Sequence, residues 1–149
     1  MVKIEPIALD TNIVIDVLNN KQVIVEALQN YREIYWPITV CGELLFGAKN
    51  SAKHTKNEPR FRQFIQACQI LNINELVAED YAEIRKTLKD KGCPLPENDI
   101  WIAATCRVNN LPLVTHDKHF EILKNITLWP EGCTMNFIIV SAWTKTLDC

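Results

Sequence analysis

The segment Ile7-Ala-Leu-Asp-Thr-Asn12 decides the fold of this chain. It closes a run of β-branched and apolar residues that begins at Val2, and such a run predicts a buried strand. The strand is expected to end at Asp10, and the apolar spacing of residues 13–18 predicts a helix directly after it. A buried strand that leads straight into a helix is typical of an α/β protein built on a mainly parallel sheet.

The same alternation of strand and helix patterns continues along the chain. Four further strands are predicted, at Ile34–Pro37, Ile70–Ile73, Leu113–Thr115 and Ile126–Trp129. Helices are predicted between them, at residues 23–30, 40–48, 61–68, 76–88, 100–108 and 116–123. Residues 50–59 are expected to form a polar connection.

The ends of three predicted helices carry recognisable signals. Thr39 can cap the helix at residues 40–48, and Asn98 or Asp99 can cap the helix at residues 100–108. Gly92 is expected to end the helix at residues 76–88.

The composition is that of an ordinary globular protein with room for one domain at 149 residues. Hydrophobic residues make up 48% and charged residues 23%, which excludes a disordered chain. The longest uncharged run, Gly132–Thr144, contains polar residues, so no membrane span is predicted. Glu5 and Asp10 lie where the apolar part of a signal peptide would be, so we expect a cytoplasmic protein.

The net charge of −2 excludes a globally basic nucleic-acid coat but leaves room for a basic face. Between residues 49 and 62 one acid, Glu58, stands against five cations: Lys49, Lys53, Lys56, Arg60 and Arg62. Such a stretch either contacts RNA phosphates or is a solvated helix face, and the sequence favours neither. Lys118 and His119 are further candidates for phosphate contact.

Four carboxylates are expected at one end of the predicted sheet. Asp10 ends the first strand and Asp117 follows the fourth, so the two converge if these strands are neighbours. Asp99 begins a helix that precedes the fourth strand, and Glu43 lies near the start of the helix after the second.

Each of these acids also has a purely structural explanation. Asp10 and Asp99 could be N-caps, and Asp117 could be a turn acid. Glu43 fits such an explanation least well, because it lies in an apolar helix where an unpaired acid is costly to bury.

A cluster of four acids predicts a divalent cation, because close carboxylates repel one another unless a cation neutralises them. Oxygen ligands favour Mg²⁺ or Mn²⁺, and these ions also bind phosphate oxygens. The corresponding chemistry is metal-assisted hydrolysis of a phosphodiester bond by water.

Four segments carry a family resemblance: Ile7–Asn12, Gly42–Ala48, Glu97–Ala104 and Val114–Phe120. In this order and spacing they resemble the PIN-domain ribonucleases, specifically the VapC toxins of bacterial type II toxin–antitoxin pairs. The resemblance implies a three-layer α/β/α sandwich with a five-stranded parallel sheet in the order 3-2-1-4-5. Residues 1–130 would form the PIN-like nuclease domain, and residues 131–149 a C-terminal extension in which Phe137–Val140 is a sixth strand or a docked segment.

The resemblance also implies a site and partners. Asp10, Glu43, Asp99 and Asp117 would be the catalytic acids that bind Mg²⁺ or Mn²⁺. The residues implied to support them are Thr11, Asn12, Asn98 and Thr115. The expected activity is endoribonuclease cleavage of tRNA or rRNA by a homodimer that a small antitoxin inhibits.

Two other functions compete with this one. The chain could be a non-catalytic PIN-fold module that binds RNA or protein. A phosphatase that forms an aspartyl-phosphate is disfavoured, because Asn12 stands where its second acid would be needed.

Overall fold

The computed structural model describes residues 6–125 and 138–139, and its sheet is parallel throughout. Four strands of three or four residues follow the order β3-β2-β1-β4. Their bounds are Ile7–Leu9 (β1), Ile34–Pro37 (β2), Gln69–Leu71 (β3) and Leu113–Thr115 (β4). The central strand β1 pairs with β2 on one side and with β4 on the other, so the predicted neighbourhood of the first and fourth strands is confirmed.

The strand that pairs with β4 at the edge of the sheet comes from a different part of the chain than predicted. A two-residue strand, β5 (Ile138–Ile139), pairs with β4 there through the register Val114 to Ile138. This segment belongs to the tail in which a sixth strand or a docked segment was expected. The fifth strand predicted at Ile126–Trp129 lies outside the described residues.

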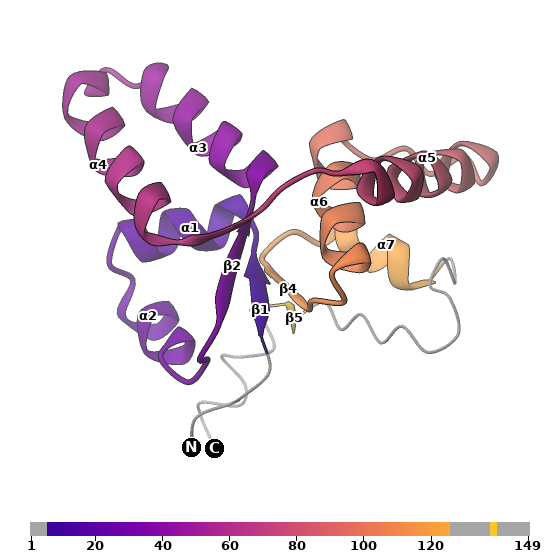
Figure 1. Cartoon of the computed structure of the whole chain (residues 1–149), viewed down its shortest axis with the longest axis horizontal. Coiled ribbons are helices and arrows are strands. Elements are labelled where there is room, and N and C mark those ends of the chain that lie inside the picture. Colours follow the sequence, from indigo (N-terminus) through magenta and orange to yellow (C-terminus); the bar gives the residue numbers. More distant parts are fainter. Residues whose placement is uncertain (1–5, 126–137, 140–149) are drawn as a thin grey trace.

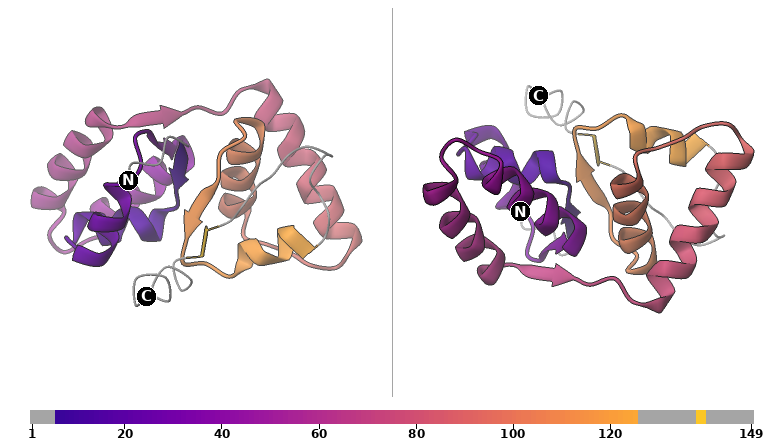
Figure 2. Two further views of the ribbon diagram at one scale, coloured as in Figure 1. Left: turned by 90° about the horizontal axis from the view of Figure 1, so that it is seen from below. Right: turned by 90° about the horizontal axis from the view of Figure 1, so that it is seen from above.

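Seven helices surround the sheet in the described part of the chain. Their bounds are Thr11–Leu18 (α1), Gln22–Leu28 (α2), Ile38–Lys49 (α3), His54–Ala67 (α4), Glu75–Asp90 (α5), Glu97–Val108 (α6) and His119–Asn125 (α7). Figures 1 and 2 show α1 to α4 gathered on one side of the strands and α5 to α7 on the other. None of the helices described is long and apolar enough to cross a membrane.

Two predicted N-caps are wrong, and the error matters for the site. Pro37 caps α3 and Pro96 caps α6, so Thr39 and Asp99 lie inside the helices. Both prolines combine φ near −55° with extended ψ, which is the backbone geometry that an N-cap position requires. The side chain of Asp99, released from capping, is free for another role.

The start of α4 differs from the sequence prediction, whereas the end of α5 agrees with it. Helix α4 begins at His54, so the polar connection predicted at residues 50–59 is shorter than expected. The helix continues through Pro59, although a proline removes one helix hydrogen bond. Gly92 follows the end of α5 with φ at +66°, a conformation that glycine adopts without strain, and this prediction is confirmed.

The core lies around β1, all three residues of which are buried. Ile13 and Val14 of α1 and Leu44 of α3 pack into the same cluster, as do Ile102 and Ala103 of α6. Because β1 has helices on both faces, its position is fixed by the most buried part of the molecule. Asp10 directly follows β1 and is therefore held in a fixed position as well.

We predict that Ile84→Ala in α5 lowers the free energy of unfolding by about 2–5 kcal/mol, because it leaves a cavity in the core. Leu76→Ala in the same helix is the control, since Leu76 is 61% exposed, and its effect should stay within about 0.5 kcal/mol. Urea unfolding of both variants measures the difference. Equal effects would show that the packing of α5 is not as described.

Candidate functional site

The carboxylate of Asp10 is the centre of a hydrogen-bond network at the carboxyl end of β1. Its Oδ1 accepts from the Thr11 backbone N–H at 2.8 Å, which confirms the N-cap role. Its Oδ2 accepts from Asn12 Nδ2 at 3.2 Å and from the Thr115 hydroxyl at 2.6 Å. Asp10 therefore caps α1 and also lies close enough to Asp117 to feel its charge, so the capping role does not exclude a role in the acidic cluster.

Glu43 approaches this network from α3. Its Oε2 accepts a hydrogen bond from the Thr11 hydroxyl at 3.0 Å, which connects it to the residue after Asp10. Its Oε1 is buried and has no hydrogen-bond partner among the described residues. An unpartnered buried carboxylate oxygen is costly, so this atom points to a missing donor or cation.

Asp99 and Asp117 lie close together, with His119 beside them. One ligand atom from each of these three residues lies within 4.8 Å of the other two. His119 Nδ1 is 3.2 Å from Asp117 Oδ1 and 3.5 Å from Asp99 Oδ2. Within the described residues Asp10 and Glu43 stand outside this close trio, although the charge of Asp10 acts on Asp99.

The electrostatics of the cluster are unfavourable without a cation. Burial raises the pKa of Asp10, and the charge of Asp117 raises it further, against the hydrogen bonds from Thr115, Thr11 and Asn12. Burial and then the charge of Asp10 raise the pKa of Glu43. For Asp99, burial and the charges of Asp10 and Asp117 raise the pKa from 3.8 to about 6. Mutual repulsion thus opposes full ionisation at neutral pH.

The donor set fits a divalent cation. Four carboxylates converge from four different elements or their ends, and one of them has a buried oxygen that no hydrogen bond satisfies. Carboxylate oxygens suit hard cations, and the imidazole of His119 adds a nitrogen at the edge of the cluster. A cation would offset the repulsion that raises these pKa values.

The predicted supporting residues fall into two groups. Thr11, Asn12 and Thr115 hydrogen-bond directly to the acids, as described above. Thr115 also accepts from the Asp117 backbone N–H at 2.9 Å, so it joins two of the acids. Asn98 is exposed in the first turn of α6, and no hydrogen bond ties its side chain to another described residue.

Most of the basic stretch is engaged in contacts within the protein. Lys49 and Arg62 both pair with Glu58, at 2.8 and 3.1 Å. Arg60 donates to the carbonyl of Leu18 at the end of α1. The side chains of Lys53 and of Lys118 are exposed, and Lys118 directly follows Asp117.

The sequence analysis missed three roles. The sequence suggests a phosphate contact for His119, or packing beside Phe120, yet its ring nitrogen lies near both Asp99 and Asp117. Asp16 and His116 pair with each other beside the site and were given no role. A usable signal for Asp16 was present, because an acid inside the apolar run of residues 13–18, four residues after Asn12, requires a partner.

Comparisons with known proteins identify the family of the chain. The PIN-domain family model matches residues 7–125. Ribonuclease VapC1 of Haemophilus influenzae is 31% identical over 124 residues, which cover 79% of this chain and 92% of that protein.

Solved structures give the same result. The crystal structure of VapBC2 from Rickettsia felis, bound to a DNA fragment from its promoter, aligns with a TM-score of 0.71 at 26% identity, covering 83% of this chain and 95% of that one. A toxin–antitoxin complex from Klebsiella pneumoniae aligns with a TM-score of 0.63 at 28% identity, covering 76% and 89%. The chain belongs to the PIN-domain family. Within that family it groups with the VapC ribonucleases, as the resemblance implied.

The raised pKa of Asp99 gives a pH-dependent prediction. A carboxyl whose pKa is higher in the folded than in the unfolded protein adds stability below its unfolded pKa of 3.8, and this stability is lost as the pH rises through about 6. At pH 7.5 in EDTA, Asp99→Asn should therefore raise the melting temperature by roughly 2–4 °C, because it removes one repelling charge.

Addition of Mn²⁺ should make the melting temperature of the parent protein higher than that of Asp99→Asn. The cation should raise the melting temperature of the parent protein more at pH 7.5 than at pH 5, and should have little effect on Asp99→Asn. Asp90→Asn, an exposed acid on α5, is the matched control and should respond as the parent does. A Mn²⁺ response that Asp99→Asn retains in full would exclude Asp99 as a ligand. Differential scanning fluorimetry measures all of these temperatures.

Proposed function

We propose that this protein is a metal-dependent endoribonuclease that acts as the toxin of a toxin–antitoxin pair. The observation that carries the proposal is the convergence of Asp10, Asp99 and Asp117 beside the unpartnered Glu43 oxygen. Membership of the PIN family and the name of the VapC1 relative support ribonuclease activity. Neither identifies the RNA, and we propose a tRNA or an rRNA.

The cation that we propose is Mg²⁺ or Mn²⁺, because the donors are mainly carboxylate oxygens. Asp10, Glu43, Asp99 and Asp117 would hold it. When bound, the cation lowers the pKa of the attacking water and offsets charge on the scissile phosphate and on the leaving oxygen.

The chain's own residues position the reactants. Hydrogen bonds from Thr11, Asn12 and Thr115 fix the orientation of the Asp10 carboxylate, so it does not have to reorganise during the reaction. The Thr11 hydroxyl holds the other oxygen of Glu43, so its unpartnered oxygen would be left to the cation. No serine or cysteine nucleophile is needed for this reaction.

Basic residues around the cluster would hold the RNA backbone. Lys118 and Lys53 are the strongest candidates, because their side chains are exposed. Lys49 and Arg62 share Glu58, whose pKa their hydrogen bonds hold below its usual range, so each is partly neutralised within the protein. Arg60 and His119 would contribute only after leaving their present partners.

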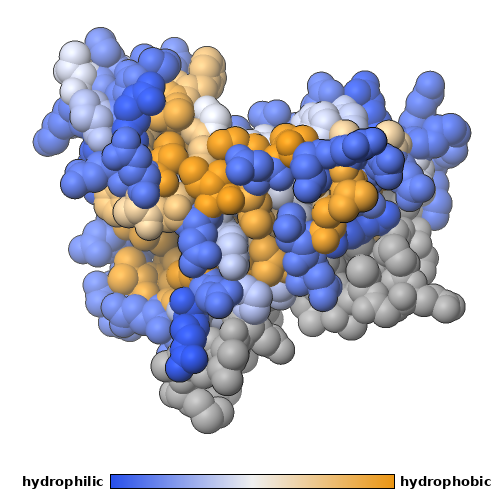
Figure 3. All heavy atoms as spheres, in the orientation of Figure 1, coloured by the Kyte–Doolittle hydropathy of each residue, from blue (hydrophilic) through white to orange (hydrophobic). Residues whose placement is uncertain are grey.

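An apolar surface supports a protein partner. Seven large apolar side chains of the described chain are exposed, among them Phe46 at 69% and Leu76 at 61%. Figure 3 shows apolar side chains at the surface between the α3–α4 hairpin and α5. A separate apolar groove of about 460 Å³ lies between α2, β2 and the end of α4. Such surfaces are typical of interaction sites, and we propose a small antitoxin as the partner of a homodimer in the cytoplasm.

We predict that the purified protein cleaves end-labelled total tRNA or rRNA at one or few sites in the presence of Mg²⁺ or Mn²⁺, and that EDTA stops the reaction. Asp10→Asn and Asp99→Asn should each lower the cleavage rate on the order of 100-fold or more, because even partners of metal ligands contribute 10- to 100-fold. Gel analysis of the labelled RNA measures both effects.

The matched control for this experiment is Asp90→Asn, the same change at an exposed position on α5, which should cleave at the parental rate. Cleavage that survives both site variants would reveal a contaminating nuclease. RNA binding that persists in EDTA, with no cleavage under any condition, would instead establish the non-catalytic binding module.

A second prediction concerns RNA affinity. Lys118→Ala should weaken RNA binding and reduce the slope of log affinity against log salt by roughly one counterion, because one phosphate contact is lost. Lys86→Ala on α5, which removes an exposed lysine paired with Asp90, should change neither. Filter binding to the Asp99→Asn protein, at several salt concentrations, separates binding from cleavage. Identical slopes for both variants would place Lys118 outside the RNA path.

A further inference from the structure

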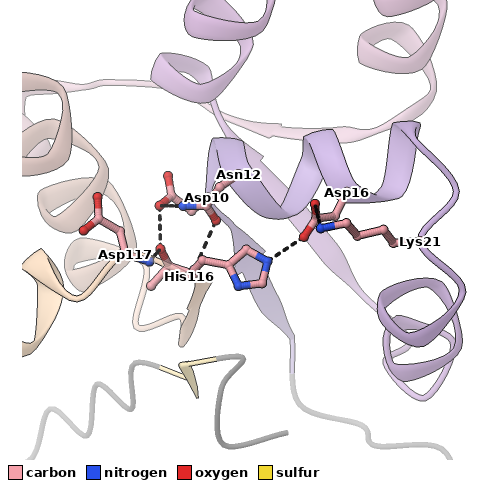
Figure 4. A network of polar contacts seen from close by, with 7 residues as sticks. Asp10, Asn12, Asp16, Lys21, His116 and Asp117 are labelled. Carbon is pink, nitrogen blue, oxygen red and sulfur yellow. Dashed lines mark hydrogen bonds and ion pairs between the residues drawn. The ribbon is translucent and has the colours of Figure 1, made fainter. Parts of the chain in front are cut away.

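A second polar cluster lies beside the acidic site and is not explained by it. Asp16 on α1 is 7% exposed and pairs with His116 Nε2 at 2.5 Å and with Lys21 Nζ at 3.0 Å. Figure 4 shows this cluster on one side of the loop that also carries Asp117. A buried carboxylate requires such partners. This requirement does not explain why one partner, His116, directly precedes Asp117.

The ionisation state of Asp16 determines which group donates in its hydrogen bond with His116. Burial alone would raise the pKa of Asp16, but the hydrogen bonds from His116 and Lys21 outweigh burial and hold the pKa below its usual value. An ionised carboxylate can only accept, so the ring of His116 donates its Nε2–H whether the imidazole is neutral or charged. The contact is therefore charge-assisted, which makes it one of the stronger kinds of hydrogen bond.

Helix α1 holds His116 at two points. The His116 backbone N–H donates to Asn12 Oδ1 at 3.1 Å, and its ring donates to Asp16. Asn12 and Asp16 are four residues apart, so both face the same side of the helix. Asn12 also donates to Asp10 through Nδ2, which connects the clamp to the centre of the site.

The residues on either side of His116 belong to the site. Thr115 before it bonds to Asp10, and Asp117 after it lies in the trio with Asp99 and His119. Strand β4 ends at Thr115, so Asp117 has no sheet hydrogen bond to hold it. Its backbone N–H is instead held by the Thr115 hydroxyl, and its chain neighbour by α1.

We propose that Asp16 and His116 are positioning residues that hold the loop carrying Asp117 at the metal site. They act through Asp117 and touch neither the other acids nor the cation. This inference rests on the proposed function, because it assigns the pair to the same cation site. The weaker partner, Lys21, has a side chain that is 62% exposed and serves only to balance the charge of Asp16.

The test measures the affinity for Mn²⁺ alone by isothermal titration calorimetry, and kcat and KM for cleavage of the same RNA. Asp16→Ala and His116→Ala should each weaken Mn²⁺ binding and lower kcat about tenfold, the usual effect of removing a partner that orients a metal ligand. KM should stay within twofold, because the pair does not bind RNA. The double variant should be no worse than either single one, because both changes break the same contact.

Two further variants separate positioning from a general loss of structure. His116→Gln places an amide Nε2–H near the position of the imidazole donor and should recover most of the Mn²⁺ affinity. Lys21→Ala should bind Mn²⁺ and cleave RNA within twofold of the parent protein. Thermal melting confirms that each variant is folded at the temperature of the assay.

Different results would overturn the positioning role alone or the proposed function as well. Additive losses in the double variant, no recovery in His116→Gln, or a change in KM confined to His116→Ala would overturn the clamp, the last by making His116 an RNA contact. Parental affinity and kcat in both alanine variants would also overturn it while leaving the proposed function intact. A parent protein that neither binds Mn²⁺ nor cleaves RNA would remove the proposed function and this inference together.

Discussion

The repulsion between carboxylates at the end of β1 is the constraint on which the rest of the site depends. The parallel pairing of β1 with β4 places Asp10 near Asp117, and the proline-capped start of α6 brings Asp99 to both. Each acid makes the ionisation of the others more costly, and burial adds to this cost. A fold retains such an arrangement when another component of the system offsets it, and a divalent cation is the simplest one that also performs chemistry.

The hydrogen bonds around the acids hold the Asp10 carboxylate in place and partly offset the cost of burial and repulsion. Asp10 accepts from three residues, and its neighbours Asn12 and Thr115 extend the network to the loop of Asp117. These bonds fix the oxygens within the protein itself, so binding of the proposed cation would require little reorganisation. The proposed role of the Asp16–His116 contact is of the same kind, because it would hold the segment that carries Asp117 after the end of β4.

Much of this arrangement could be predicted from the sequence, because the relevant signals are local. The apolar run before Asp10 predicts the central strand, and acids at two strand ends and near two helix starts make Asp10, Asp117, Glu43 and Asp99 candidates for one site. The helix starts at α3 and α6 could not be predicted in the same way, because Pro37 and Pro96 take cap positions that Thr39 and Asp99 suit by side-chain chemistry. The strand beside β4 also depends on long-range pairing, which periodicity does not report.

Side-chain partnerships were the least predictable feature. His119 and Asp99 are separated by twenty residues, and Asp16 and His116 by one hundred, so no spacing rule connects them. The pairing of Lys49 with Glu58 across α3 and α4 was equally hidden, whereas Arg62 lies four residues after Glu58, the usual spacing of an ion pair on one helix. Such contacts follow from the packing of α1, α3 and α6 around the sheet. This packing depends on the whole sequence and not on any local pattern.

The central claim is that the acids at the end of β1 form a divalent metal site. The most direct measurement is anomalous diffraction from crystals of the protein soaked in Mn²⁺, collected near the manganese edge. We expect a strong anomalous peak in contact with the carboxylates of Asp99 and Asp117 and on the side that faces Asp10. A well-diffracting, Mn²⁺-soaked crystal with no peak at this position, or with its strongest peak elsewhere, would contradict it.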